Sequence, residues 1–357
     1  MLHRTKLQSQ TGMTMGAPPP NSEDELERLL SEPTPGVLET LRHTEGDILV
    51  LGAGGKMGPT LARMARRALD AVQPKAKVIA VSRFSQSGAE HRLRAASVET
   101  ISCDLTDRAA VDTLPDAPNV IFMAGQKFGT SDMPGATWMM NAVVPSIVAE
   151  RYQKSRIVAF STGNVYPFVP VESGGSLEED DLAPVGEYAA SCLARERILA
   201  YQSERALTPM AIVRLNYAVE LRYGVLVDIA SKVWNREPVD VRMGFANVIW
   251  QGCACARALE CLPHASSPPF ILNVTGPQTI SIRTIAQRFG DVLGRPAVIE
   301  GTEDQDALLS NASRMVELMG EPEVSVGQMM VWIADWIQRG RPLLNKPTHF
   351  EERGGKF

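Results

Sequence analysis

The 357-residue sequence has no excess of positive charge. Its 41 acidic residues outnumber its 36 lysines and arginines, which gives a formal net charge of −5 at pH 7. Proteins that bind nucleic acids or anionic membranes usually carry a basic surface. The composition therefore argues against a nucleic-acid partner and against a membrane-surface partner.

Cysteine is scarce, and its spacing fits neither a disulfide framework nor a zinc site. The five cysteines are an odd number and are widely scattered: Cys103, Cys192, Cys253, Cys255 and Cys261. We expect free, buried thiols, as in a reducing compartment, and no metal centre.

Long apolar runs are also absent. No stretch approaches the roughly 20 apolar residues of a membrane-spanning helix, and the first residues lack the apolar core of a signal peptide. Residues 1–22 are too polar to order themselves, and a capped amphipathic helix follows at 22–30. We therefore expect a cytoplasmic protein whose residues 1–36 form a disordered tail and a short helix.

The most informative stretch that is present spans residues 47–58. Aliphatic residues lead into glycines at three-residue spacing, and helical periodicity resumes after them. Glycines let the backbone approach a ligand, and a helix N-terminus offers unpaired N–H groups to an anion. This context predicts a dinucleotide pyrophosphate site; the alternative is a tight turn without a ligand. We assign cofactor contacts to Gly52, Gly55, Lys56, Met57 and Gly58.

Short β-rich runs alternate with helical segments along most of the chain. They lie at residues 76–81, 98–102, 119–124, 156–160, 210–214 and 269–274. This alternation predicts an α/β protein with a Rossmann-type doubly wound parallel sheet. We expect a cofactor-binding domain at 37–215, with the strand at 269–275 returning to the sheet, a smaller C-terminal substrate lobe at 216–346 with helices at 281–293 and 326–338, and a tail at 347–357.

Ligands of such sheets bind beyond the carboxyl ends of the strands, so the residues there are candidate contacts. Arg83 would pair with a 2′-phosphate and favours NADP over NAD, unless it is a solvated surface arginine. Asp104, with Leu105 after it, would accept a hydrogen bond from adenine, or would cap a helix. Ala124 and Gly125 are small enough to let the backbone pass close to the cofactor.

Several motifs, taken in order, resemble the extended short-chain dehydrogenase/reductase family, the NAD(P)-dependent epimerase/dehydratase group. They are the glycine turn, Asp104-Leu105, the Ser-Thr-x-x-Val-Tyr run at 161–166, the Tyr-x-x-Ser helix at 188–191 and the run at 273–282. The resemblance covers about residues 47–338. It implies NADP or NAD as cofactor, a nucleotide sugar or related carbohydrate as substrate, and often a homodimer.

By position, the resemblance implies that Thr162 holds the substrate oxygen and that Tyr188 transfers a proton. Asn141 matches an asparagine on the preceding helix of the family, and we group it with the cofactor contacts. Taken alone, Thr162 would be a satisfied strand-end hydroxyl and Tyr188 a packed helix residue. The stretch at 214–220 matches the family only loosely. A free sugar, a sugar acid or another hydroxy-carbonyl compound therefore stays an alternative to a nucleotide-linked sugar.

One position departs from the family pattern. The family has a lysine four residues after the tyrosine, whereas this chain has Cys192. Such a lysine lies one helical turn away and lowers the phenol pKa, which a neutral thiol does not do. Lys127 or Arg195 would be the replacement, and we prefer Lys127. The competing interpretation is a cofactor-binding scaffold or sensor that has lost catalysis.

Overall fold

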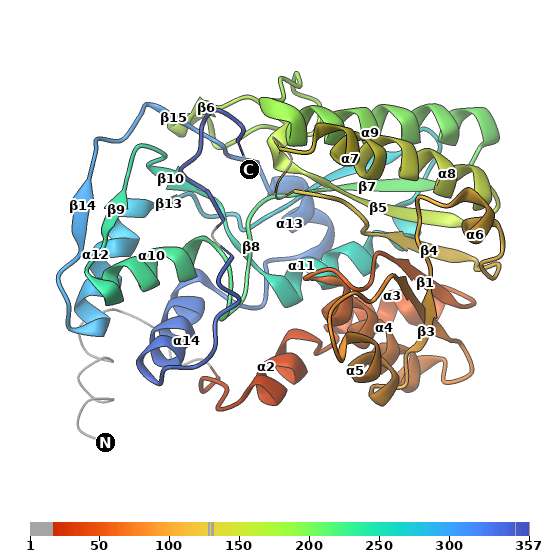
Figure 1. The fold of residues 1–357 in the computed structure, drawn as a ribbon, viewed down its shortest axis with the longest axis horizontal. Helices are drawn as coiled ribbons and strands as arrows, with labels where there is room; N and C mark the ends of the chain where they lie inside the picture. Colours follow the sequence, from red (N-terminus) through yellow and green to blue (C-terminus); the bar gives the residue numbers. More distant parts are fainter. Residues whose placement is uncertain (1–16, 128, 130–131, 347, 357) are drawn as a thin grey trace.

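The computed structural model describes residues 17–127, 129, 132–346 and 348–356, so most of the expected N-terminal tail lies outside the described residues. Seven parallel strands form its central sheet in the order β12-β7-β5-β4-β1-β2-β3 (Figure 1). They are β1 (Ile48–Leu51), β2 (Val78–Ser82), β3 (Glu99–Ser102), β4 (Asn119–Phe122), β5 (Arg156–Thr162), β7 (Met210–Leu215) and β12 (Phe270–Val274). The strand order reverses beside β1, which confirms the Rossmann-type doubly wound fold.

The strand pattern of the sequence is reproduced closely. Each predicted run after the glycine turn begins and ends within two residues of the observed strand. All residues of β1 and β4 are buried, because helices cover both faces of the sheet and leave no solvent-facing side. This burial explains why these strands are continuous aliphatic runs.

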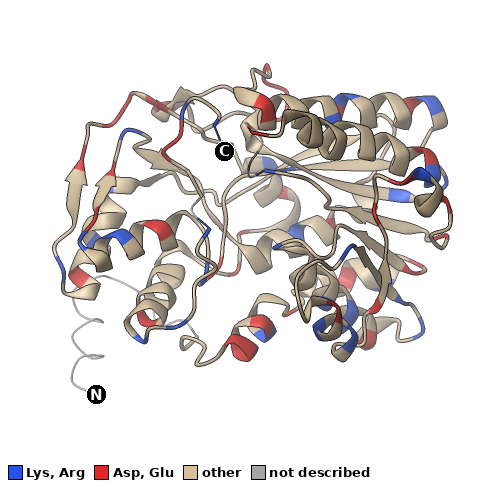
Figure 2. Cartoon of the chain, in the orientation of Figure 1, with Lys and Arg blue, Asp and Glu red and all other residues tan. Residues whose placement is uncertain are grey.

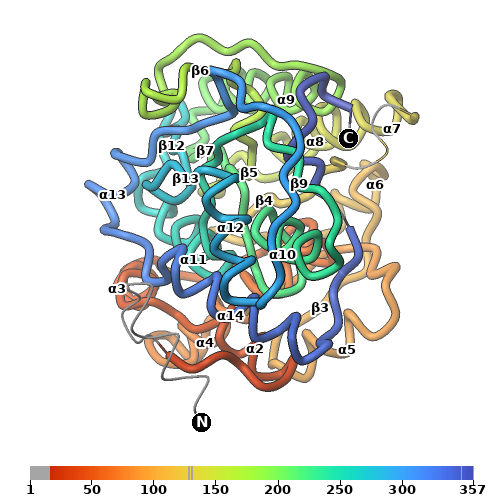
Figure 3. The backbone as a smooth tube through the Cα atoms, turned by 90° about the vertical axis from the view of Figure 1, so that its left-hand side faces the viewer, coloured from red at the N-terminus to blue at the C-terminus, as the bar shows by residue number. Residues whose placement is uncertain are grey.

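Two layers of helices enclose the sheet (Figures 1 and 3). α4 (Gly58–Val72) and α11 (Gln251–Glu260) pack together on one face, and α8 (Val144–Arg151) and α9 (Gly186–Ala206) pack together on the other. Shorter elements connect them: α5 (Ala89–Ala95), α6 (Arg108–Asp112), α7 (Pro134–Trp138), the π-helix η1 (Met139–Val143) and the 3-10 turns η2 (Gly163–Val165), η3 (Val171–Ser173) and η4 (Leu262–His264).

The two N-terminal helices belong to the main core. Ser22 caps α2 (Glu23–Leu30) by accepting a hydrogen bond from the Glu25 N–H at 3.1 Å, as the sequence predicted. Leu26 and Leu30 of α2 are fully buried, and α2 packs on α4 and α11. The sequence analysis did not identify α3 (Pro35–His43), which also packs on α4 and α11.

A smaller lobe lies at the left of Figure 1. Its helices α10 (Val225–Asn235), α12 (Ile282–Leu293) and α14 (Val326–Gln338) pack on one another, and the last two match the predicted helices. Four short strand pairs complete it: β9 (Pro238–Asp240) with β14 (Val298–Glu300), β10 (Phe245–Ala246) with β13 (Ile280–Ser281), β8 (Ala218–Val219) with β11 (Ile249–Trp250), and β6 (Val169–Pro170) with β15 (Asp306–Ala307). The short helix α13 (Ser313–Met319) packs on β12 and α11 of the main domain instead.

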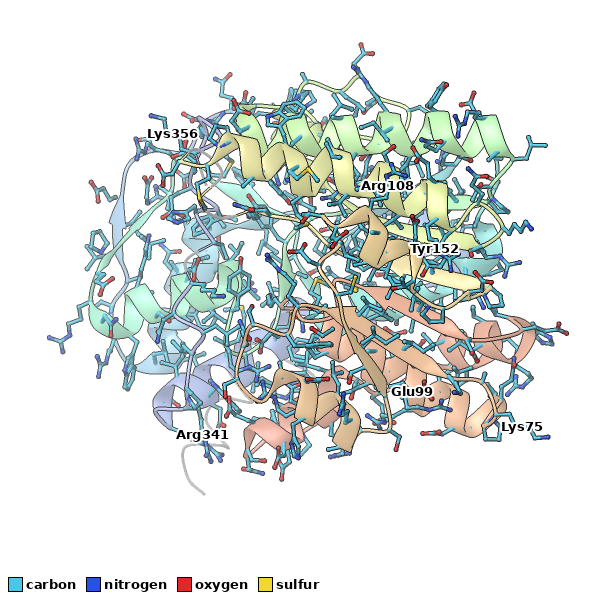
Figure 4. The ribbon with its side chains drawn as sticks, turned by 45° about the vertical axis from the view of Figure 1, so that its right-hand side comes forward. Lys75, Glu99, Arg108, Tyr152, Arg341 and Lys356 are labelled. Carbon is cyan, nitrogen blue, oxygen red and sulfur yellow. The ribbon has the colours of Figure 1, made fainter. Side chains whose placement is uncertain are left out.

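Charged residues mark the outer elements, whereas the central sheet carries few (Figure 2). On the flank seen in Figure 4, Arg108 of α6 donates a hydrogen bond to Glu150 of α8 at 2.7 Å, and the Tyr152 hydroxyl donates to the Pro115 carbonyl at 3.1 Å. All five cysteines are free and buried, as expected. In the part of the chain that the structure describes, no cluster of three or more His, Cys, Asp or Glu side chains is arranged to hold a metal ion, and no helix combines the length and apolarity that a bilayer crossing needs.

Candidate active site

The glycine turn between β1 and α4 needs glycine at specific positions. Gly52 has a φ of +89°, and a Cβ there would lie 2.5 Å from the Ala124 nitrogen. A Cβ on Gly58 would lie 2.5 Å from the Ala53 oxygen, so glycine allows the helix to start close to the strand. Around Gly55 the space is open apart from the Gly52 oxygen. The turn thus leaves room for a ligand at its outer side.

The start of α4 faces this space. No side chain caps its first turn, so its N–H groups are available to an anion. The residues present therefore fit a bound pyrophosphate, because the backbone approaches closely and offers both N–H donors and a partial positive charge.

A cavity of about 280 Å³ lies beyond the carboxyl ends of β1, β4, β5 and β7. Of the sequence-predicted site residues, it is lined by Gly52, Gly55, Lys56, Met57, Gly58, Gly125, Thr162 and Tyr188. A second cavity of about 590 Å³ adjoins it and shares Gly55, Lys56, Gly125 and Lys127. Both cavities therefore border the glycine turn.

The remaining predicted contacts lie outside the lining of both cavities. Arg83 is largely exposed after β2 and Asp104 is partly exposed after β3, with 3.7 Å between Arg83 Nη1 and Asp104 Oδ2. Asp104 Oδ1 accepts hydrogen bonds from the Thr106 N–H at 3.0 Å and its hydroxyl at 2.8 Å, which lower the pKa of Asp104. The cap of α6 is Asp107, not Asp104. Leu105 is buried, and Ala124 packs against Gly52.

Thr162 and Tyr188 meet in the first cavity. Thr162 ends β5, and its Oγ1 accepts hydrogen bonds from the Asn164 N–H at 3.2 Å and the Asn164 amide at 2.9 Å. The Tyr188 hydroxyl, from the first turn of α9, is hydrogen-bonded to Thr162 and to Cys192. Burial is the main cause that raises the pKa of Tyr188, and Cys192 adds to the rise, whereas the Thr162 hydrogen bond and the charge of Arg195 lower it.

Cys192 lies one helical turn beyond Tyr188 and is 1% exposed. Burial raises the pKa of its thiol, so the thiol is neutral near pH 7. Residue 192, which lies beside the Tyr188 phenol on the same helix, therefore carries no positive charge.

Arg195 does not reach the cavity. Its Nη1 donates to the Phe160 oxygen at 2.7 Å, and its Nε and Nη2 donate to the backbone oxygen and Oδ1 of Asn141 at 3.2 and 2.9 Å. Asn141 lies in the π-helix, is fully buried and also bonds Ser191 Oγ at 3.0 Å and the Gln126 backbone at 2.8 and 2.9 Å. Arg195 and Asn141 thus fix the segment after β4.

Lys127 extends from this fixed segment into both cavities. Its Nζ lies 5.9 Å from the centroid of the Tyr188 ring. Burial lowers the pKa of Lys127 to about 8. Lys127 therefore places a titratable ammonium near the ring of Tyr188, the residue that the sequence analysis proposed for proton transfer.

The sequence analysis missed the contacts of the Lys56 side chain. Lys56 Nζ lies 3.7 Å from the centroid of the Tyr223 ring and 3.4 Å from the Ala218 oxygen, so it links the glycine turn to the smaller lobe. Burial lowers the pKa of Lys56 to about 7. In the sequence, only the presence of a lysine, Lys56, within a glycine-rich turn pointed to this contact.

The sequence model of the NAD dependent epimerase/dehydratase family matches residues 48–219. These residues belong to that family. The match runs from β1 to β8 and includes the glycine turn, Thr162 and Tyr188, so the family resemblance of the motifs within residues 48–219 is confirmed.

Solved structures share the fold of this chain. Pal from Bacillus thuringiensis has a TM-score of 0.69 and 18% identity, with coverage of 83% of this chain and 100% of that chain. Two UDP-glucose 4-epimerases each have a TM-score of 0.67, with coverage of 82% of this chain and 99% of theirs. One, from Thermotoga maritima with UDP-glucose, is 15% identical; the other, from Thermus thermophilus with NAD, is 18% identical. No curated protein sequence matches the chain.

Proposed function

We propose that the protein is an NAD(P)-dependent enzyme that oxidises, reduces or epimerises a hydroxyl or carbonyl group of a sugar or sugar-derived substrate. The observation that carries the proposal is the hydrogen-bonded pair of Thr162 and Tyr188 in a cavity that also borders the glycine turn. The family match and the structures of NAD-bound relatives support it. In this proposal, residues 37–215 with the strand at 269–275 bind the cofactor, and residues 216–346 form the substrate lobe.

The glycine turn and the start of α4 would hold the pyrophosphate of the cofactor. Arg83, Asp104 and Leu105 stand where the adenosine half would lie, and Ala124 and Gly125 border its path. The lean toward NADP rests on Arg83, whose largely exposed guanidinium after β2 would pair with a 2′-phosphate. A nicotinamide bound along the strand ends would supply hydride transfer.

The proton transfers belong to the chain's own residues. Thr162 would hold the reacting oxygen by its hydroxyl, and the Tyr188 phenol would give or take the proton. Because burial raises the phenol pKa, a positive charge nearby is needed to bring it back toward the working pH. Lys127 would supply that charge in place of the family lysine, with its ammonium beside the Tyr188 ring.

We also propose a homodimer in the cytoplasm. Trp138 at the end of α7 is 39% exposed and Tyr201 of α9 is 64% exposed, although both are large side chains. Trp138 donates a hydrogen bond to Glu187 at the start of α9, and Tyr201 lies roughly four turns further along this helix. A second copy packed along α9 would cover both aromatic side chains. Analytical ultracentrifugation of wild type beside Tyr201→Glu would test this, with a shift toward monomer expected in the variant.

The competing function is a cofactor-binding scaffold, and the buried neutral thiol of Cys192 is the observation that favours it. Purified protein titrated with NAD and NADP, followed by product analysis on a panel of sugars, sugar acids and nucleotide sugars, separates the two. Binding with product formation supports the enzyme. Binding without product on the whole panel supports the scaffold.

A further inference from the structure

The C-terminal residues 348–356, here called the C-terminal strap, are not a free tail. In Figure 1 the strap, drawn dark blue, passes β10 and ends beside α9. Thr348 is 3% exposed and Phe350 is 1% exposed, and Phe350 belongs to the main hydrophobic core. Lys356, labelled in Figure 4, lies at the start of α9. The strap therefore follows the substrate side of the site.

The first part of the strap is bound to α10 of the smaller lobe. The Thr348 N–H and hydroxyl both donate to Asp228 Oδ2, at 2.8 and 2.6 Å. Lys232 Nζ lies 3.1 Å from Glu351 Oε1. Thr348 also lines the first cavity together with Tyr188, so this part of the strap is a wall of the candidate active site.

The second part of the strap is bound to the opposite side of the lobe. The Arg353 guanidinium lies 4.3 Å from the centroid of the Phe168 ring, and its Nε lies 3.2 Å from Asp304 Oδ2. Arg353 also donates to the Asp306 backbone oxygen at 3.2 Å and forms an ion pair with the Asp306 carboxylate. Arg353 thereby joins the strap to β15 and to the segment before β6.

The end of the strap touches the helix that carries the phenol. A Cβ on Gly355 would lie 2.3 Å from the Val185 oxygen, and a Cβ on Gly186 would lie 2.4 Å from the Gly355 oxygen. The two backbones are in direct contact two residues before Tyr188. The strap therefore spans from α10 to the start of α9. It covers the side of the cavity on which a substrate bound to the smaller lobe would lie.

From this path we propose that the strap closes the substrate side of the cavity and limits the substrate to a small sugar or sugar acid that carries no nucleotide. The inference rests on the proposed function and narrows its substrate class. A cavity of about 280 Å³ falls just below the roughly 300–1,000 Å³ typical of ligand sites, and the nicotinamide end of the cofactor takes part of it. The adjoining cavity of about 590 Å³ borders the glycine turn and α5, on the cofactor side. A nucleotide attached to the reacting sugar on the substrate side would therefore have to occupy the space of the strap.

The test is calorimetric titration of the full-length protein with UDP-glucose, with and without NADP. We expect no binding up to millimolar concentration. The double variant Glu351→Ala/Arg353→Ala removes two anchors of the strap but keeps Phe350, and we expect it to bind UDP-glucose at least tenfold more tightly. Lys356→Ala at the exposed end of the strap is the matched control and should behave as wild type.

Micromolar UDP-glucose binding by the full-length protein would overturn the proposal. So would a double variant that excludes UDP-glucose as fully as the control does. If the double variant does not fold, Glu351→Ala alone, which removes a partly exposed ion pair, serves for the same comparison. The titration needs no turnover, so its result is separate from a failure of the proposed function, which would appear as absent cofactor binding or absent product.

Discussion

At the scale of single residues, the account depends on the charge beside Tyr188. Lys127 contributes an ammonium that the helix position of Cys192 does not. The pKa of Lys127 is lowered to about 8, so the ammonium is present below that pH and is lost above it. Catalysis by Tyr188 should follow the same titration, because the phenol loses its supporting charge as pH rises.

Lys127→Met should therefore lower kcat by about 10²-fold near pH 7, within the usual range of general acid–base effects. The fall of wild-type kcat above pH 8 should disappear in the variant. The measurement is kcat against pH, with the exposed Lys154→Met as control. Superimposable pH profiles would remove Lys127 from the mechanism.

Gly52 gives a second test at residue scale. An alanine there would have a φ of +89° and a Cβ 2.5 Å from backbone of the next strand end. We expect Gly52→Ala to lower the free energy of unfolding by about 1–3 kcal/mol and to weaken cofactor binding at least tenfold. Urea unfolding and cofactor fluorescence measure the two effects.

Gly135→Ala is the matched control, because its Cβ would meet no atom within 4 Å. It should leave both quantities nearly unchanged. Equal losses in the two variants would mean that the turn conformation of Gly52 is not special.

The local part of the site could be predicted from the sequence. The glycine spacing identifies the turn, because the geometry of a turn depends on residues that are neighbours in the sequence. The motifs likewise place Thr162 at the end of a strand and Tyr188 near the start of a helix. The Lys56 contact with Tyr223 and the Arg195 contact with Asn141 join residues far apart in the chain. No local periodicity encodes such pairs. Asn141, which the sequence analysis grouped with the cofactor contacts, lines neither cavity and is bonded to Arg195.

At the scale of elements, α9 is held to the sheet by a buried ion pair. Arg214 of β7 and Glu196 of α9 approach to 2.8 Å between Nη2 and Oε2, and both side chains are almost fully buried. Ser161, beside Thr162, donates to the same carboxylate at 2.5 Å. The pair therefore fixes both the end of β5 and the helix that carries Tyr188.

Arg214→Met should lower the free energy of unfolding by about 3–5 kcal/mol, because it leaves the Glu196 charge buried without its partner. The double variant Arg214→Met/Glu196→Gln should lose less, since no charge then remains. Urea denaturation measures both, and the exposed Arg197→Met on the same helix should stay within about 0.5 kcal/mol of wild type. A single variant as stable as the double variant would contradict the account.

The sequence predicted regular elements better than irregular ones. Strands and amphipathic helices follow hydrophobic periodicity, which is why α12 and α14 were found. The π-helix η1 was not predicted, because Asn141 within it is bonded to Arg195, Ser191 and Gln126 from other elements. The π-helix therefore coincides with contacts from distant elements, which the local sequence does not reveal.

At the scale of the whole molecule, the cofactor side and the substrate side differ in how predictable they are. The sheet follows a repeating strand and helix pattern that the sequence displays directly. The smaller lobe is assembled from short strand pairs far apart in the chain, such as β6 with β15. The polar C-terminal segment suggested a tail, yet the buried Phe350 and the backbone contact of Gly355 with Gly186 hold it to the lobes.

The central claim is that Tyr188 carries out proton transfer beside a nicotinamide bound at the glycine turn. The measurement is the nicotinamide absorbance of wild type and Tyr188→Phe with NADP or NAD and the substrate found by product analysis, in rapid-mixing experiments that also detect transient reduction. We predict a reduced nicotinamide signal in wild type and at least a 10²-fold slower signal in Tyr188→Phe, with cofactor binding unchanged. An equal rate in the two proteins, or no signal in wild type saturated with cofactor and substrate, would contradict the account.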